Sequence, residues 1–305
     1  MPTVVVFGHS TTTTAVIVGL MHLDNGLDVT VPDDSDEQQF NDLVALGGMG
    51  HNSVRKATPK VVAAADLLVF TDFDSVSTAD AGDTVTEANM RPLRDALNAA
   101  MASGFDGSIL VATTRDDLMT YFAQRFSGVP NDRVLGVGTA AHSIYTANRI
   151  ARELNVPVDN VAVDVVGTAS DYQVLWSRAA VSTVPLLSMV QNDATDVSAN
   201  LIQVVDRDLQ QFVAGIGAAV VADVVARIVA VLLSDGSDIV PLTLITNAGE
   251  DLNVSARPAV VGQRHAQVLP RVAGAQAEEE AWAAITGHVR DEIKTIENNI
   301  SGSKD

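Results

Sequence analysis

The sequence predicts an α/β protein built on a mostly parallel sheet, and three observations support that prediction. Apolar residues make up 47% of the 305 residues and aromatic residues only 4%, with alanine and valine abundant. Valine-rich runs are typical of strands buried on both faces, and alanine-rich stretches favour the helices that cover them. Short apolar runs also alternate with longer amphipathic stretches, as parallel strands joined by right-handed helical crossovers require.

In the first half of the chain, five apolar runs bounded by polar turns are expected to form strands. The first run ends at Gly8 and leads, through a polar stretch, into the helical segment AVIVGLMHL. Further helices are expected through Met90–Ala102 and in DLMTYFAQRF, which stops before Gly128 and Pro130. The five expected strands are Val4–Phe7, Asp28–Asp34, Leu67–Asp72, Ser108–Thr113 and Arg133–Gly138.

The second half is expected to contain longer helices and fewer strands. A helix in IYTANRIARELN precedes a strand at Asn160–Gly167, and one long helix is predicted through Asp196–Leu233. Two further strands are expected, in IVPLTLIT and near Pro258–Val261. The last element, Ala277–Ile300, is an amphipathic helix with acids early and Lys294 late, as the helix dipole favours.

Charge and cysteine content exclude several kinds of function. The net charge of −19 repels phosphate backbones, so we expect no nucleic-acid partner. The acidic surface is either a solubilising surface or an adaptation to high salt. The chain has no cysteine, which excludes disulfides and thiolate metal sites, and no clustered histidine or carboxylate ligand set predicts a metal. The lysines that accompany this charge are only Lys56, Lys60, Lys294 and Lys304.

Neither a secretion signal nor a membrane span is expected. The opening MPTVVVFGHS lacks a basic region and an apolar core of signal-peptide type, so it is interpreted as a strand. The longest apolar stretch, Val213–Leu233, is interrupted by Asp223 and Arg227, which a membrane span would rarely tolerate. We therefore expect a cytoplasmic protein without a membrane partner.

Three segments resemble the L-lactate dehydrogenase (lactate/malate dehydrogenase) family. Met101–Thr139 resembles the family stretch around its fourth and fifth strands, with ATTRDD where the family usually reads ATNPVD. Glu153–Leu186 resembles the start of the catalytic domain, with GTASDYQV where the family usually reads GEHGDSEV. LNVSARPAVVGQRHAQVLP resembles the late strand pair.

The resemblance implies a two-part architecture and a set of partners. Residues 1–142 would form a Rossmann-like, doubly wound parallel sheet of NAD-binding type. Residues 143–305 would form the mixed α/β (α+β) C-terminal domain. NAD would be the cofactor, and the chain would form a homodimer or tetramer, or a hetero-oligomer with active homologues.

The dinucleotide fingerprint is incomplete. It requires glycines for a tight turn, for close approach of the pyrophosphate, and for packing of the helix on the strand. The corresponding positions are Gly8, Ser10 and Thr13, so only the first glycine is retained. Asp33 matches the acid that accepts from the adenosine ribose, although aspartate at a strand end is also ordinary turn chemistry. Two hypotheses remain open: a capped helix without a ligand, or a site for a smaller anion.

The catalytic set that the resemblance implies is replaced throughout. Hydride transfer to a 2-oxo acid needs a histidine for proton transfer, oriented by a carboxylate. It also needs an arginine for the substrate carboxylate, a second arginine on a closing loop, and an orienting asparagine. The corresponding positions here are Ala169 for the histidine, His142 for its carboxylate, Tyr145 for the first arginine, about Gly82 for the loop arginine and Thr114 for the asparagine.

Loss of a general base alone typically costs ~10²–10⁴ in rate. The favoured hypothesis is therefore a pseudoenzyme, a lactate dehydrogenase-like chain without the inherited reaction. The alternative is an active oxidoreductase of the same family with a remodelled site and a different substrate. In that alternative, His142 would serve as the base, and Arg115 or Arg149 would bind a carboxylate.

Overall fold

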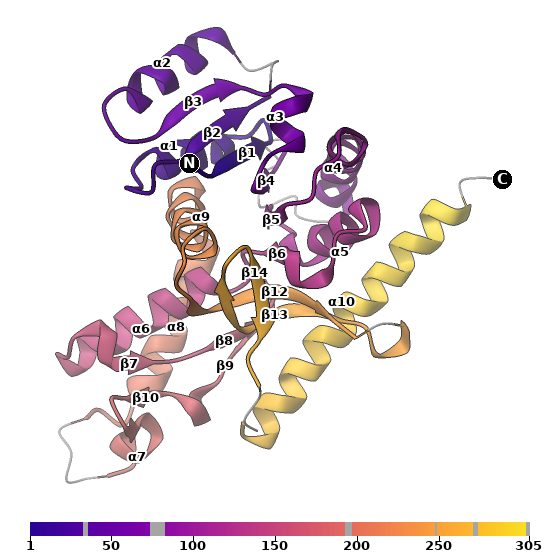
Figure 1. Cartoon of the computed structure of the whole chain (residues 1–305). Helices are drawn as coiled ribbons and strands as arrows, with labels where there is room; N and C mark the ends of the chain where they lie inside the picture. Colours follow the sequence, from indigo (N-terminus) through magenta and orange to yellow (C-terminus); the bar gives the residue numbers. More distant parts are fainter. Residues whose placement is uncertain (33–35, 74–82, 193–196, 248, 271–273, 303–305) are drawn as a thin grey trace.

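The computed structural model describes residues 1–32, 36–73, 83–192, 197–247, 249–270 and 274–302 (Figure 1). Its main sheet runs in the order β3-β2-β1-β4-β5-β6-β12-β13-β8-β9, with β14 paired to β13. A small second sheet has the order β11-β10-β7. The strands of the main sheet are β1 Thr3–Phe7, β2 Asp28–Val31, β3 Ser53–Lys56, β4 Leu67–Thr71, β5 Ser108–Ala112, β6 Val134–Gly136, β8 Val165–Gly167, β9 Tyr172–Val174, β12 Asp238–Thr246, β13 Asn253–Gly262 and β14 His265–Val268.

The first six strands pair in parallel, which confirms the predicted α/β fold. Successive residues of β1 face opposite layers of helices. Val4 and Val6 pack with residues of α1 and α9, whereas Val5 packs with residues of α4 and α5. The sheet is therefore covered on both faces, as in a doubly wound fold. The helices are α1 Thr11–Met21, α2 Glu37–Gly47, α3 Pro59–Ala63, α4 Asp83–Ser103, α5 Asp116–Ser127, α6 Ala140–Leu154, α7 Leu186–Val190, α8 Leu201–Ala214, α9 Ala218–Leu232 and α10 Gln276–Gly302.

The prediction of one long helix through Asp196–Leu233 is wrong. The segment forms α8 and α9, which meet at an angle of 102°. Gly215 caps α8 and Gly217 precedes α9, and glycine disfavours a continuous helix because its backbone loses more conformational freedom on folding. The turn lays α9 along α1, where a Cβ on Gly19 would lie 3.1 Å from the carbonyl oxygen of Ala222. Asp196 itself lies outside the described residues.

The second half continues the main sheet rather than starting a separate one. Thr243 of β12 pairs with Gly136 of β6, and β12 runs antiparallel to β13 over its whole length. Helix α6 spans the predicted boundary at residues 142/143, and that division of domains stays a prediction. The small sheet consists of β7 Val161–Ala162, β10 Ala180–Val181 and β11 Val184–Pro185.

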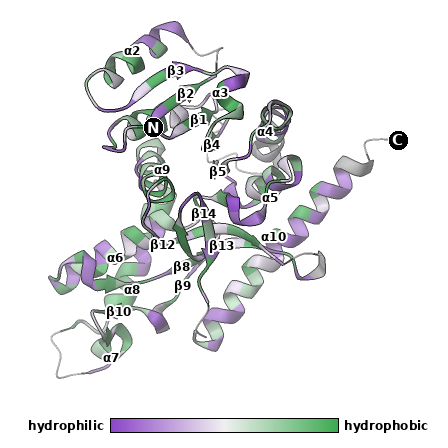
Figure 2. Ribbon diagram, in the orientation of Figure 1, coloured by the Kyte–Doolittle hydropathy of each residue, from purple (hydrophilic) through white to green (hydrophobic). Residues whose placement is uncertain are grey.

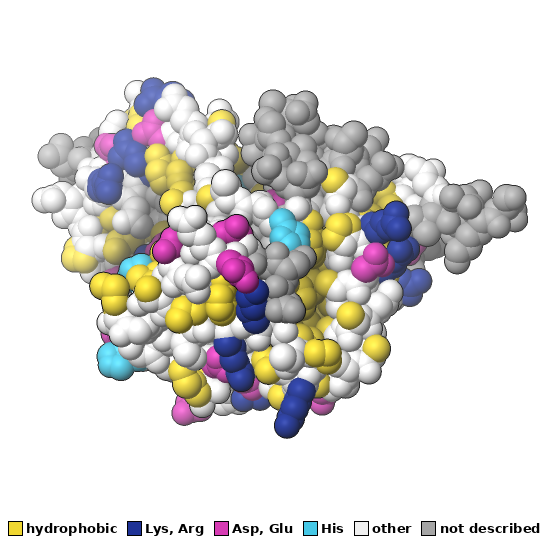
Figure 3. All heavy atoms as spheres, turned by 90° about the horizontal axis from the view of Figure 1, so that it is seen from above, with side chains coloured by type: hydrophobic (Ala, Val, Ile, Leu, Met, Phe, Trp, Pro, Cys, Tyr) yellow, Lys and Arg dark blue, Asp and Glu magenta, His cyan; other side chains and the backbone are white. Residues whose placement is uncertain are grey.

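Apolar residues concentrate on α9 and the central strands, while α6 and α10 alternate apolar and polar residues (Figure 2). In the described part of the chain, no single helix combines the length and apolar content of a membrane span, and only the bent α8–α9 pair reaches them together. On the face shown in Figure 3, acidic and basic side chains are interspersed with apolar ones. Local ion pairs such as Arg227 with Asp223, at 2.8 Å, bring some of these opposite charges into contact.

Candidate functional site

The start of α1 is closed by its own side chains. Gly8 has a φ of +140°, and a Cβ there would fall 2.1 Å from Thr71 Oγ1, so this position requires glycine. Ser10 caps α1: its Oγ accepts from the Thr13 amide at 3.4 Å, and Thr13 Oγ1 accepts from the Ser10 amide at 3.0 Å. Thr13 Oγ1 also lies 2.7 Å from Thr71 Oγ1. This capping box engages the amide of Thr13, one of the N–H groups that a helix start offers to an anion.

Aromatic side chains lie where β1 and β4 end. His9 follows β1 and Phe73 follows β4, and their ring centroids lie 6.1 Å apart at an angle of 57°. The backbone ties the two loops together, because the His9 amide donates to the Asp72 carbonyl at 3.2 Å. The crevice between these two strands is the switch point at which ligands bind in doubly wound folds. A pyrophosphate lying along it would meet these rings and the Ser10 side chain.

Two of the predicted site residues, Asp33 and Gly82, lie outside the described residues. Beside Asp36 is a cavity of about 190 Å³ between α1, β2 and α2. Its floor is apolar, and its rim carries Ser10, Thr14 and Gln39, of which Gln39 donates through Nε2 to Thr14 Oγ1. The hypothesis of a smaller ligand near the start of α1 therefore stays open.

The imidazole of His142 lies beneath the position that the resemblance gives to a catalytic histidine. His142 Nε2 lies 3.0 Å from the carbonyl oxygen of Ala169, and its ring meets the Tyr172 ring edge-on at 5.0 Å. The side chain is 1% exposed, and burial lowers its pKa to about 4. Because a carbonyl can only accept, Nε2 carries the proton, and Nδ1 has no partner among the described residues. His142 is thus a neutral core residue in this structure, without an open path to a substrate.

A pH titration of stability tests this burial. Because its pKa is lowered in the folded state, His142 is harder to protonate there than in the unfolded chain. The contribution of neutral His142 to the free energy of unfolding is therefore complete above about pH 6.5. It is lost as the pH falls toward 4, by up to about 3 kcal/mol. Urea unfolding of His142→Asn should lack this part of the acid sensitivity, while the exposed His51→Asn should retain it. An unchanged acid slope in His142→Asn would contradict a buried neutral imidazole.

Tyr145, which occupies the position of the family's substrate-binding arginine, lies in an apolar cluster. The Tyr145 ring stacks on Phe212 of α8, with centroids 4.1 Å apart and planes within 7°. Leu209, Val165 and Val174 are fully buried beside this pair. A carboxylate has no positive partner among these side chains, and transferring it there from water would be costly.

The two arginines of the alternative hypothesis, Arg115 and Arg149, are each paired with two acids. Arg149 pairs with Glu153 at 2.7 Å and with Asp208 at 2.8 Å. Arg115 donates to Asp117 at 2.8 Å and makes two bonds to the Glu292 carboxylate of α10, at 2.8 and 2.7 Å. All three guanidinium nitrogens of Arg115 are engaged by these acids, so Arg115 could not bind a substrate carboxylate without first leaving them.

Thr114, which occupies the position of the family's asparagine, is also engaged in hydrogen bonds within the chain. Its amide and hydroxyl both donate to the Asp72 carboxylate, at 3.1 and 2.9 Å. Burial raises the pKa of Asp72, while these bonds from Thr114 oppose that rise. Thr114 therefore joins the ends of β4 and β5 rather than facing a ligand.

Asp116 is a buried ionisable group that the sequence interpretation missed. It is 1% exposed, and its Oδ2 accepts from the Gly138 amide at 2.8 Å. Burial and the neighbouring charge of Asp117 raise its pKa to about 7. The signal was present in ATTRDD, because Asp116 falls where the family usually reads valine.

Comparisons with known proteins agree with this architecture. A family model described as lactate/malate dehydrogenase, alpha/beta C-terminal domain, matches residues 142–300. L-lactate dehydrogenase 1 of Listeria innocua is 29% identical over 209 residues, covering 66% of this chain and 67% of that protein. L-lactate dehydrogenase 1 of Enterococcus faecalis is 27% identical over 241 residues, covering 76% and 73%.

Solved structures show the same fold. The minor L-lactate dehydrogenase from Enterococcus mundtii, in its ligands-bound form, superimposes with a TM-score of 0.86 at 21% identity, covering 97% of this chain and 98% of that one. The similarity extends through both halves of the chain. With the C-terminal match over more than half of its length, this chain belongs to the lactate/malate dehydrogenase family.

Proposed function

We propose that this chain is a lactate dehydrogenase-like pseudoenzyme, a family member that does not interconvert 2-hydroxy and 2-oxo acids. The arrangement of His142 is the main support for this. Its proton-bearing nitrogen is bonded to the Ala169 carbonyl, inside the core. The engagement of every guanidinium nitrogen of Arg115 adds to it, because binding a substrate carboxylate requires N–H groups that are not already used.

NAD, which the family implies, does not fit the residues at the start of α1. Its pyrophosphate needs slim backbone and unengaged N–H groups at a helix start. Here Ser10 brings a side chain, the Thr13 amide is capped, and His9 faces Phe73 across the switch point. We therefore derive no reaction step through a nicotinamide.

Binding and turnover assays test the proposal together. NADH is expected to cause no saturable rise in the melting temperature, because ligand stabilisation requires binding to the folded state. Pyruvate, oxaloacetate and branched 2-oxo acids are expected to give no NADH oxidation above the protein-free rate. An active family homologue assayed in parallel provides the positive control.

The alternative, an active oxidoreductase with a remodelled site, predicts a different result. It is supported by the cavity of about 190 Å³ beside α1, which leaves room for a smaller ligand. Detectable turnover that disappears in His142→Ala would establish this alternative and exclude the pseudoenzyme.

The proposal also covers the oligomeric state and the cellular location of the chain. We propose a homodimer or tetramer, or a mixed oligomer with active homologues, located in the cytoplasm. Light scattering of the purified chain, alone and mixed with a homologue, measures the assembly.

A further inference from the structure

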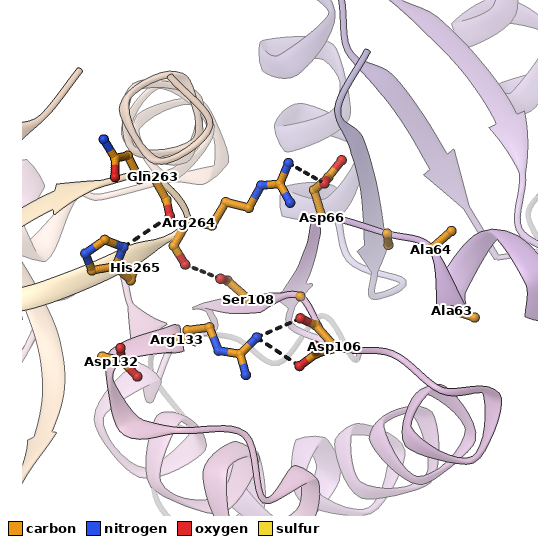
Figure 4. Close-up of a pocket in the computed structure, with 12 residues that line it drawn as sticks. Ala63, Ala64, Asp66, Asp106, Ser108, Asp132, Arg133, Gln263, Arg264 and His265 are labelled. Carbon is orange, nitrogen blue, oxygen red and sulfur yellow. Dashed lines mark hydrogen bonds and ion pairs between the residues drawn. The ribbon is translucent and has the colours of Figure 1, made fainter. Parts of the chain in front are cut away.

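A second cavity lies at the opposite edge of the sheet from the switch point. It has a volume of about 510 Å³, within the range of small-molecule pockets. Four separate parts of the chain form it: the turns before β4 and β5, the short 3-10 helix Asn131–Arg133, and the tip of the β13–β14 hairpin (Figure 4). None of the described candidate site residues lines this cavity, so it is independent of the proposed loss of hydride transfer.

Two arginines reach into this cavity. Arg264 Nη2 bonds Asp66 at 2.9 Å, and Arg133 Nη1 bonds the backbone and carboxylate oxygens of Asp106 at 2.7 and 3.0 Å. Figure 4 shows both guanidinium groups crossing the cavity toward these acids, with Ser108 between them. The other guanidinium nitrogens have no bond to another described residue. The acids thus hold each arginine side chain in place and leave other N–H groups to donate to a carboxylate. Because the side chains are already ordered, less conformational entropy is lost when a ligand binds.

The same cavity also carries groups suited to a cation. Asp132 is exposed and has no partner among the described residues, and the Asp106 side chain is 88% exposed with one carboxylate oxygen engaged. The backbone at Gly107 is tightly packed, and the Asp66 carbonyl oxygen already accepts from the Ser108 amide at 3.1 Å. An ammonium group would therefore find its acceptors in the Asp132 and Asp106 carboxylates.

The charges decide which ligand fits. Three carboxylates and two guanidinium groups give a formal charge of −1. A dianion would add to this negative charge, and a simple cation would face two arginines. A ligand with one carboxylate and one ammonium group meets a complementary partner at each end. Ala63 and Ala64 also line the cavity, where they would contact a small aliphatic group.

The hairpin tip forms one rim of this cavity. Gln263 and Arg264 have φ values of 51° and 67° and form the two-residue turn between the paired residues Gly262 and His265. Positive φ at both positions is the geometry that such a tight hairpin turn requires. The tip is fixed to the rest of the chain, since the Arg264 amide donates to the Leu232 carbonyl at 2.7 Å and Ser108 donates to the Arg264 carbonyl.

We propose that this cavity binds a free α-amino acid with a small aliphatic side chain. Arg133 and Arg264 bind its carboxylate, Asp132 and Asp106 bind its ammonium group, and Ala63 and Ala64 contact its side chain.

Calorimetry and thermal shift with L-alanine, acetate and methylammonium test this site on the full-length chain. L-alanine should bind saturably, and each half-ligand more than about tenfold less tightly, because each makes only one of the two charged contacts. Arg264→Gln and Asp132→Asn should each weaken alanine binding about tenfold, whereas Arg227→Gln on α9 should leave it unchanged. Because Asp132 is exposed, its variant is expected to fold normally, which circular dichroism checks.

Three results would overturn the proposal. They are absence of alanine binding at millimolar concentration, acetate binding as tight as that of alanine, and alanine binding that Arg264→Gln and Asp132→Asn leave unchanged. None depends on whether NADH binds, so this site and the pseudoenzyme proposal fail separately.

Discussion

Replacing Arg115 with alanine is expected to destabilise the folded chain by roughly 3–5 kcal/mol. Arg115 is 18% exposed and lies between Asp117, which is 3% exposed, and Glu292 of α10. Without the guanidinium, Asp117 is left as a buried charge without its positive partner. The free energy of unfolding from urea titration at neutral pH measures the loss.

Two control variants test whether the stability loss in Arg115→Ala comes from the burial of its ion pair. Glu292→Gln leaves the Arg115–Asp117 pair in place and removes only the contact to α10, so it should cost about 1 kcal/mol. Arg91→Ala breaks a pair in which both side chains are well exposed, and should change stability by less than about 0.5 kcal/mol. Equal effects of Arg115→Ala and Arg91→Ala would show that the α5–α10 ion pair is not buried in solution.

Raising the pH from about 4 to 8 is expected to lower the free energy of unfolding by about 4 kcal/mol through the ionisation of Asp116 alone. Its pKa in the folded state is about 7, above the ordinary value of 3.8, so folding favours the protonated acid. This stability is complete below about pH 4 and is lost as the pH rises toward 7. Asp116→Asn keeps an oxygen for the Gly138 amide but does not ionise.

The pH profile of Asp116→Asn is therefore the measurement. The variant should gain stability over the natural chain at pH 8 and match it near pH 4. Asp235→Asn, at an exposed position, should follow the natural profile throughout. If the Asp116→Asn profile paralleled the natural one, Asp116 would be ionised in the folded chain at both pH values.

Alternation of apolar runs and helical stretches was sufficient to predict the parallel strands, because both faces of those strands are buried. The same criterion missed β3, in which Ser53 and Arg55 are exposed and only Val54 is buried. An edge strand of four residues with one buried side chain has no pattern that distinguishes it from a loop. The break between α8 and α9 was missed because the apolar pattern continues across Gly215 and Gly217. The packing of α9 on α1 selects the bend there.

The candidate site was also predicted only in part. The loss of the family's catalytic groups could be recognised from residue identity, because Ala169 has no proton to transfer and Tyr145 has no positive charge. What took their place depends on contacts between distant parts of the chain. Arg115 and Glu292 lie 177 positions apart, and neither sequence segment indicates the other. His142 was considered as a base, and only the structure shows its ring bonded to Ala169 in the core.

The pairing of β6 with β12 has a consequence for shortened forms of this chain. A fragment ending at residue 142 would leave β6 as an open sheet edge, with backbone donors and acceptors available to other copies. It would also uncover Val16 and Leu20 of α1, whose cover includes Val225 and Ile228 of α9. The N-terminal half expressed alone should therefore aggregate, and studies of its ligands require the intact polypeptide.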